Sequence, residues 1–184
     1  MAEDASLHAR TDAPSIAIAG VALSLAWNVR GNAADAAFLE AVTRRLSLAL
    51  PLQPNSSAQS DDASLLWLGP TSWLFIDTRD PSHATFDDAR RALNDAGGAL
   101  FDLSSSYVAW KVVGHAAARV LNRGCPLDLH PGAFPAGHCA QSMLGHLTAL
   151  VHRPDDSSAF IVLAARSFAR DAQAFLEEAA AAES

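Results

Sequence analysis

The sequence predicts an α+β fold built from two similar halves. Short segments with apolar side chains at every second position predict strands that have one buried face. Segments between them place apolar residues three or four positions apart, which is the spacing of an amphipathic helix. In the first half the order of these segments is β-α-β-β-α-β, and the second half repeats the theme. We therefore expect two split β-α-β, ferredoxin-like halves, residues 15–103 and 104–184.

The first half begins with one strand and one helix. Residues 1–14 are small and polar without periodicity, and we expect them to form a disordered tail. A strand is predicted where apolar residues alternate, at Val21, Leu23, Leu25 and Trp27. Asn32 is the candidate N-cap of the next helix, which ends before Pro51. The apolar stripe of that helix consists of Ala36, Leu39, Val42 and Leu46.

A hairpin, a second helix and a strand complete the first half. Residues 51–63 form a polar connection that is rich in turn residues. Two short apolar runs follow, Leu65–Leu68 and Trp73–Asp77, and the Gly-Pro turn between them predicts a hairpin. Ser82–Ala96 ends at two glycines, as a helix commonly does, and Ala99–Leu103 is the last strand. The apolar face of this helix consists of Phe86, Ala89, Leu93 and Ala96.

The second half repeats the order of elements but shows no close sequence repeat. It opens with a strand at Tyr107–Val113 and a short helix at His115–Arg123. Residues 125–137 form an irregular loop that three prolines stiffen. Three strands follow, at Cys139–Leu144, His146–His152 and Ala159–Ala165. Ser167 is the candidate cap of a last helix, whose apolar side carries Phe168, Ala172, Phe175 and Ala179.

The composition excludes several classes of protein. Hydrophobic residues make up 50% of the 184 and charged residues 18%, a balance typical of a compact globular chain. The formal charge of −7 leaves no basic surplus for a phosphate backbone, so we expect no nucleic-acid partner. No apolar run approaches the roughly 20 residues that cross a bilayer, so we expect no membrane contact and a cytoplasmic location. The two cysteines fit a reducing compartment.

Motifs of the common cofactor and catalytic sites are missing from the sequence. The only lysine, Lys111, lies in an apolar run and not after a glycine-rich turn, which excludes a P-loop. The ten glycines are scattered, so a dinucleotide has no GxGxxG cradle. The motifs GxSxG, HExxH and CxxC are absent as well. Composition and motifs alone therefore indicate no catalytic or cofactor chemistry on this chain.

The most distinctive segment is Arg123–Pro131, with the sequence RGCPLDLHP. Potential metal ligands lie in and after it, at Cys125, His130, His138, Cys139 and His146. Their spacing argues against a metal, because structural zinc uses closely spaced cysteine pairs and the adjacent His138 and Cys139 would diverge on a strand. We expect a structural loop in which Cys125 is buried and Asp128 accepts hydrogen bonds from backbone N–H groups.

Two tryptophans, Trp67 and Trp73, flank the predicted hairpin turn. Aromatic residues at such a position most often pack in the core, and exposed tryptophan is also a common interface anchor. The sequence leaves both roles open for each of them.

Together these motifs resemble the gamma subunit of heterotetrameric sarcosine oxidase. The specific part is the GCPLDLHP segment at Gly124–Pro131, followed by Phe134, Gly137 and Cys139. Supporting segments are Leu68-Gly69-Pro70 with Trp73-Leu74, Asp102-Leu103-Ser104, Gly114 with Ala118 and Val120-Leu121, Leu144-Gly145 and Arg166-Ser167-Phe168-Ala169. The resemblance covers roughly Ala13–Ala180, although the alanine-rich N-terminal third and residues 51–63 carry no family pattern.

The resemblance implies a fold similar to the folate-binding domain of the glycine-cleavage aminomethyltransferase. It also implies a place in an αβγδ enzyme that oxidatively demethylates sarcosine to glycine, with formation of hydrogen peroxide and of 5,10-methylenetetrahydrofolate or formaldehyde. FAD, FMN, NAD and tetrahydrofolate are then expected on the partner subunits, and zinc on delta. This chain is expected to be a non-catalytic structural subunit that packs chiefly on alpha and also meets beta and delta.

The expected partner interface combines the two tryptophans with the Cys-Pro loop, at Trp67, Trp73, Cys125, Pro126, Asp128, His130 and Phe134. Without partners the chain is expected to self-associate. Two alternatives stay open. One is a stand-alone folate-binding protein of one-carbon metabolism, with a pterin between the halves. The other is a small enzyme that uses Cys125 as a nucleophile near His130, which requires a depressed thiol pKa and partial exposure.

Overall fold

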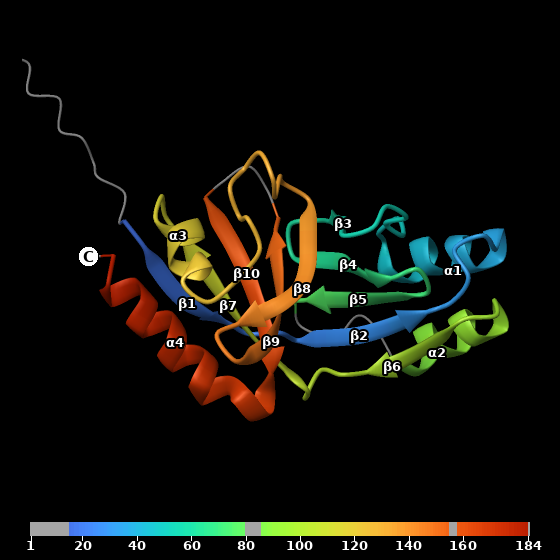
Figure 1. Cartoon of the computed structure of the whole chain (residues 1–184). Coiled ribbons are helices and arrows are strands. Elements are labelled where there is room, and N and C mark those ends of the chain that lie inside the picture. Colours follow the sequence, from blue (N-terminus) through green and yellow to red (C-terminus); the bar gives the residue numbers. More distant parts are fainter. Residues whose placement is uncertain (1–14, 80–85, 155–157, 184) are drawn as a thin grey trace, which may run out of the picture.

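Two five-stranded antiparallel sheets form the centre of the molecule (Figure 1). The computed structural model describes residues 15–79, 86–154 and 158–183. The expected disordered tail, residues 1–14, lies outside the described residues. Figure 1 shows α1 and α2 at one end of the molecule and α3 and α4 at the other, so each sheet has its own pair of helices. The predicted α+β class with two halves is confirmed.

The first sheet has the strand order β3-β4-β5-β2-β6. Its strands are β2 (Leu25–Arg30), β3 (Ser57–Gln59), β4 (Ala63–Gly69), β5 (Ser72–Asp77) and β6 (Ala99–Asp102). Its helices are α1 (Ala36–Leu46) and α2 (Phe86–Asp95). Without the short edge strand β3, these elements follow the split β-α-β-β-α-β order that the sequence predicts. The predicted hairpin is β4 and β5, and β3 is an addition inside the polar connection.

The second sheet has the strand order β1-β7-β10-β9-β8. Its strands are β1 (Ala17–Val21), β7 (Tyr107–Val113), β8 (His138–Leu144), β9 (Leu147–Arg153) and β10 (Ala159–Ala165). Its helices are α3 (Ala117–Asn122), the 3₁₀ turn η2 (Arg166–Phe168) and α4 (Ala169–Ala181). The predicted strands of this half match β7 to β10 closely in their positions.

The N-terminal strand departs from the prediction. The alternation from Val21 to Trp27 predicts one strand, whereas the structure has two, β1 and β2, separated by residues 22–24. β1 pairs with β7 in the second sheet, and β2 pairs with β5 and β6 in the first. The chain therefore crosses between the sheets here, and the predicted division at residue 103 places β1 with the wrong sheet.

This crossing gives the two sheets the same topology. β3, β4, β5, β2 and β6 correspond in order to β8, β9, β10, β7 and β1. In the first sheet, β6 follows α2 along the chain, whereas the N-terminal β1 occupies the corresponding place in the second. The second half is thus a ferredoxin-like unit whose outer strand comes from the beginning of the chain.

Two predicted helix caps are wrong. The N-cap of α1 is Asp35, whose side chain accepts a hydrogen bond from the Ala37 N–H. Asn32 instead accepts from the Ala34 N–H at 3.0 Å and so orders the turn before the helix. Ser167 lies inside the η2 turn, and α4 begins after Phe168 without a side-chain cap. Phe168, predicted on the buried face, is 46% exposed.

Three large clusters form most of the hydrophobic core, and a small fourth one lies between α3 and α4. One cluster joins the first sheet to α1 and α2, around Trp27, Phe38 and Trp73. Another joins the second sheet to α3 and α4, through residues that include Leu121 and Leu176. A third lies between the inner faces of the two sheets and includes Ala26, Leu66, Leu74, Leu150 and Leu163. Burial between the sheets holds the halves together as one body.

Polar contacts join the sheets where the edge strands β3 and β8 meet. Ser56 forms a β-bridge with His138, and the Cys139 N–H donates to the Asn55 carbonyl at 2.8 Å. The Ser57 N–H donates to the Gly137 carbonyl at 2.8 Å. The Ser57 hydroxyl is also 3.0 Å from Nε2 of the buried His152. The seam thus satisfies backbone groups that would otherwise be unpaired at the edges of the two sheets.

Candidate functional site

The distinctive 125–137 loop lies on the surface, and three of its side chains are buried in the core beneath it. Cys125, Leu129 and Phe134 are buried in the core of the second half. Pro126 and His130, which lie between these anchors, are exposed. The loop therefore alternates buried anchors with exposed side chains.

Hydrogen bonds within the loop fix its shape. The His130 N–H donates to Asp128 Oδ1 at 3.0 Å, and the Gly132 N–H donates to His130 Nδ1 at 3.2 Å. Arg153 Nη1, from the end of β9, donates to the Phe134 carbonyl at 2.9 Å. Asp128 accepts from the loop backbone as the sequence predicts. A preorganised loop of this kind loses little conformational entropy when a partner binds to it.

The start of the loop packs tightly against α4 and the β8–β9 turn. The Gly145 N–H donates to the Gly124 carbonyl at 3.0 Å, and the Phe175 ring lies over Gly124. A Cβ at position 124 would lie 2.5 Å from the Phe175 ring and 2.6 Å from the Gly145 nitrogen. The glycine of the GCP segment is therefore required for close packing.

Of the seven residues predicted at a partner interface, three are buried within the chain itself. Trp73 is 0% exposed and donates from Nε1 to the Pro51 carbonyl at 2.8 Å. Cys125 and Phe134 are 2% and 5% exposed. Because their side chains fill the core, they cannot anchor a partner, and this part of the prediction is corrected. The exposed or half-buried members are Trp67, Pro126, Asp128 and His130.

The structure does not support Cys125 as a nucleophile. Its Sγ lies 3.7 Å from the Ser142 hydroxyl, and its side chain is buried. His130 is exposed and uses its Nδ1 to accept from the Gly132 N–H. The two side chains thus make separate contacts, without the electropositive, partly exposed setting that a reactive thiolate needs.

The second cysteine is held in its neutral form. Cys139 is fully buried on β8, and burial raises the pKa of its thiol from 9.0 to about 11, partly offset by a hydrogen bond with the Trp67 backbone. The neutral thiol donates to the Ser56 carbonyl at 3.3 Å, at the seam between the sheets. Cys139 is therefore a structural residue.

Cys139 makes stability fall in alkaline solution. Between pH 9 and about pH 11 the unfolded chain releases the thiol proton while the folded chain keeps it, so deprotonation favours unfolding. We expect a loss of about 2–3 kcal/mol across this range. Urea unfolding at about pH 8 and about pH 10.5 measures it. The same two measurements on Cys139→Ala give the loss of unfolding free energy that other titrating groups cause. If this variant lost as much stability as wild type, Cys139 would not be the cause of the alkaline loss.

The potential metal ligands that the sequence analysis considered and argued against do not form a metal site in the described part of the chain. Among residues 15–79, 86–154 and 158–183, no three His, Cys, Asp or Glu side chains are placed to hold a metal ion. The donor set therefore offers no fit for zinc in the described part of the chain.

No helix among the described residues is long and apolar enough to cross a membrane.

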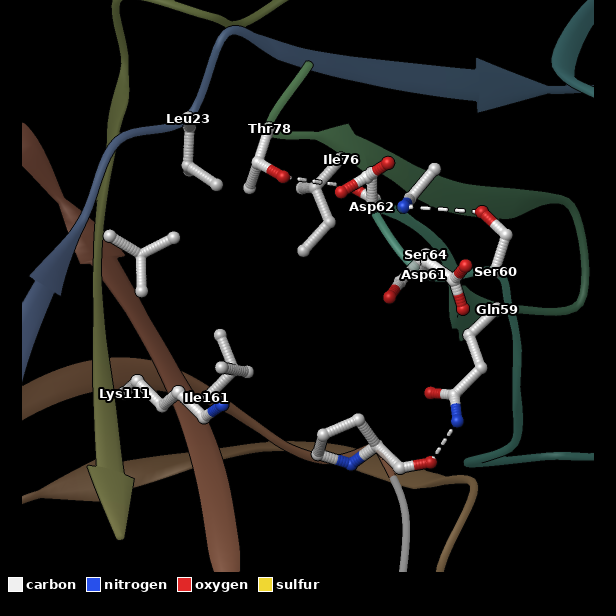
Figure 2. Close-up of a pocket in the computed structure, with 13 residues that line it drawn as sticks. Leu23, Gln59, Ser60, Asp61, Asp62, Ser64, Ile76, Thr78, Lys111 and Ile161 are labelled. Atoms are coloured by element: carbon white, nitrogen blue, oxygen red, sulfur yellow. Dashed lines mark hydrogen bonds between the residues drawn. The ribbon is translucent and has the colours of Figure 1, made fainter.

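A cleft lies between the two sheets, and the sequence analysis identified none of its lining residues as a site. It has a volume of about 520 Å³, within the range of small-molecule sites. Figure 2 shows Asp61, Asp62 and Ser64 on one side of it. Lys111 and Ile161, neighbours on β7 and β10, lie on the other side. Six separate segments of the chain contribute to this cleft, so no local motif marks it.

Comparison with known proteins places the chain in a family. The model of the sarcosine oxidase gamma subunit family matches residues 30–183. Sarcosine oxidase subunit gamma of Corynebacterium sp. (strain P-1) is 33% identical over 135 residues, which are 73% of this chain and 64% of that protein. The Arthrobacter sp. subunit gamma is 31% identical over the same shares of each chain. The alignments thus span somewhat less than two thirds of these relatives.

Two solved structures share the fold. A chain of the heterotetrameric sarcosine oxidase from Corynebacterium sp. U-96 superposes with a TM-score of 0.81 at 25% identity, over 91% of this chain and 86% of that chain. Aminomethyltransferase T from Bartonella henselae superposes with a TM-score of 0.62 at 14% identity, over 88% of this chain and 45% of that one. The second likeness confirms the predicted fold relationship. By sequence and by structure, the chain belongs to the sarcosine oxidase gamma subunit family.

Proposed function

We propose that this chain is the gamma subunit of a cytoplasmic heterotetrameric sarcosine oxidase and serves it as a non-catalytic structural subunit. The enzyme would oxidatively demethylate sarcosine to glycine and form hydrogen peroxide with 5,10-methylenetetrahydrofolate or formaldehyde. FAD, FMN, NAD and tetrahydrofolate would bind to the partner subunits. The alpha, beta and delta subunits would be the partners, with alpha the chief one.

The observation that carries this proposal is the superposition on a chain of a heterotetrameric sarcosine oxidase, which extends over nearly the whole length of both chains. Both sheets and their helices are thus shared, beyond the ferredoxin-like unit that many unrelated proteins contain. The buried state of Cys125 and Cys139 supports a role without covalent chemistry on this chain.

Isolation of the chain with its partners tests the proposal. A tagged chain is pulled down from its native cells, retained proteins are identified by mass, and absorbance is recorded at about 450 nm, where protein-bound flavin absorbs. We expect three further subunits, a yellow eluate and sarcosine-dependent peroxide. A colourless chain without partners, or sarcosine oxidation by the chain alone, would contradict the proposal.

The exposed face of the 125–137 loop is our proposed contact with the partner. The double variant Pro126→Glu, His130→Glu places two charges there without touching the buried anchors. We expect recovery of partner subunits to fall about tenfold or more, because interface cores exclude uncompensated charge. Quantitative pull-down with the wild-type chain as reference measures the effect.

The matched control is Gln53→Glu, Thr71→Glu, which adds two charges at exposed positions of the first half. The control is expected to unfold within about 0.5 kcal/mol of wild type, since its two side chains are exposed. The loop variant is expected to lose about 1–2 kcal/mol, because it removes a proline and the hydrogen bond from the Gly132 N–H to His130. Circular dichroism establishes that both are folded in the pull-down. If the loop variant and the control recovered equal amounts of partner subunits, the proposal that this loop contacts a partner would be contradicted.

A stand-alone folate-binding protein is the second candidate, favoured by the presence of a cleft of ligand size between the sheets. The residues that line this cleft in the described structure include no aromatic ring on which a pterin would stack. Titration of the purified chain with tetrahydrofolate distinguishes the candidates. Saturable binding would support the folate-binding candidate, and no binding would favour the subunit role.

A further inference from the structure

Charges of opposite sign face the cleft between the sheets (Figure 2). The positive charge belongs to Lys111, the only lysine in the chain, which is exposed on β7. No acidic side chain among the described residues forms an ion pair with it. The stem of Lys111 lies beside Ile161, its cross-strand neighbour on β10. An unpaired ammonium beside an apolar wall is suited to an anionic group of a ligand.

The negative charges lie on the opposite wall, at the turn between β3 and β4. Asp61 and Asp62 are exposed and line the cleft. The turn is held in place because the Thr78 N–H donates to the Asp62 carbonyl at 3.0 Å and the Ser60 N–H donates to the Ala63 carbonyl at 2.8 Å. The nearby cation Arg79 forms its ion pair with Asp77 and has a weaker electrostatic interaction with Asp62. The two carboxylates therefore sit on a fixed backbone and can receive a cationic group.

Aliphatic side chains lie between the two charged walls. Leu23, Ile76 and Ile161 line the cleft together with Val21. The side-chain amide of Gln59 donates to the Pro154 carbonyl and so bridges the two sheets at one end of the cleft (Figure 2). This bridge and the core between the sheets set the separation of the two walls. The cavity thus offers an apolar middle and opposite charges at its sides, which is the complement of a zwitterion.

We propose that the cleft binds a small aliphatic zwitterion, with its ammonium group at Asp61 and Asp62 and its carboxylate at Lys111. The lining contains no aromatic ring among the described residues, so the body of the ligand is an alkyl group and not a flat ring system. This binding does not depend on the proposed subunit role, because every lining residue belongs to this chain.

The single lysine makes the site directly observable. The full chain is labelled with ¹³C at the lysine ε position, so that Lys111 gives the only signal. The probe is the dipeptide leucylglycine, and N-acetyl-leucylglycine and leucylglycinamide are its matched analogues without the ammonium and without the carboxylate. We expect a saturable shift of the Lys111 signal with leucylglycine, with a dissociation constant of about 1 mM. Each analogue should bind about tenfold more weakly, equivalent to the loss of about 1.4 kcal/mol.

Variants assign each end of the ligand, with binding measured by calorimetry. Lys111→Met removes the ammonium group but keeps an unbranched side chain of nearly the same length, and it should abolish the preference for leucylglycine over leucylglycinamide. The double variant Asp61→Asn, Asp62→Asn should abolish the preference over N-acetyl-leucylglycine. The controls Arg45→Gln and Glu178→Gln remove exposed charges outside the cleft and should leave both preferences unchanged.

Three results would overturn the proposal. The first is a Lys111 signal that does not shift, or shifts without saturation. The second is equal affinity for leucylglycine and both analogues. The third is an unchanged preference in the cleft variants when their thermal unfolding matches wild type, which shows that they are folded. None of these three results would contradict the proposed subunit role, because pull-down of the partner subunits tests that role separately.

Discussion

Replacement of Gly124 by alanine is expected to destabilise the chain by about 3 kcal/mol, near the upper end of the cost of overpacking a core. The added Cβ would lie 2.5 Å from the Phe175 ring and 2.6 Å from the backbone nitrogen of Gly145. The ring can rotate only within a packed interface between the loop and α4, and the Gly145 nitrogen is fixed by its hydrogen bond with the Gly124 carbonyl. The midpoint of urea unfolding measures the loss.

The matched control for this substitution is Gly20→Ala. Gly20 lies in β1, and a Cβ there would meet no atom within 4 Å. Alanine also reduces the conformational freedom of the unfolded chain, so stability should be unchanged or slightly higher. If the two variants unfolded at the same midpoint, the close packing of the GCP segment against α4 would be refuted.

The second large effect is expected for Trp73→Ala, which should cost about 3–5 kcal/mol. Trp73 is fully buried, donates to the Pro51 carbonyl at 2.8 Å, and packs against Phe38 with a ring-centroid distance of 6.2 Å. Truncation leaves a cavity and an unpaired buried carbonyl at once. Urea unfolding is again the measurement, with circular dichroism to establish that the variant is folded in buffer.

Trp67→Ala is the internal comparison, because Trp67 is the cross-strand neighbour of Trp73 and is only half-buried. We expect a loss of stability smaller than that of Trp73→Ala, since less apolar surface returns to water. A larger loss for Trp67→Ala than for Trp73→Ala would contradict the assignment of Trp73 to the core.

Local patterns predict most elements of this fold because their apolar faces are buried where they form. The strand Tyr107–Val113 has the predicted bounds, and the predicted helix faces bury Val42, Leu46, Ala89 and Leu93. The break after Val21 is different. Apolar alternation continues through Leu23 because this residue also packs between the sheets, so no change of pattern marks the end of β1.

Positions that depend on distant partners were not predictable in the same way. Trp67 and Trp73 flank one turn, yet only the packing of α1 and the carbonyl of Pro51 make Trp73 a core residue. The cleft depends on the placement of Lys111 opposite the 61–62 turn, 50 positions earlier in the chain, which only the pairing of the two sheets brings about. The steric requirement for glycine at position 124 likewise comes from α4 and the β8–β9 turn, which contact it in the folded chain.

The most direct test of the subunit role is the native mass of the purified assembly. The chain is co-expressed with the proposed alpha, beta and delta partners, and the mass of the intact product is measured by native mass spectrometry. We predict one mass equal to the sum of one copy of each subunit with bound flavin. A complete flavoprotein of alpha, beta and delta that leaves this chain free would contradict the account.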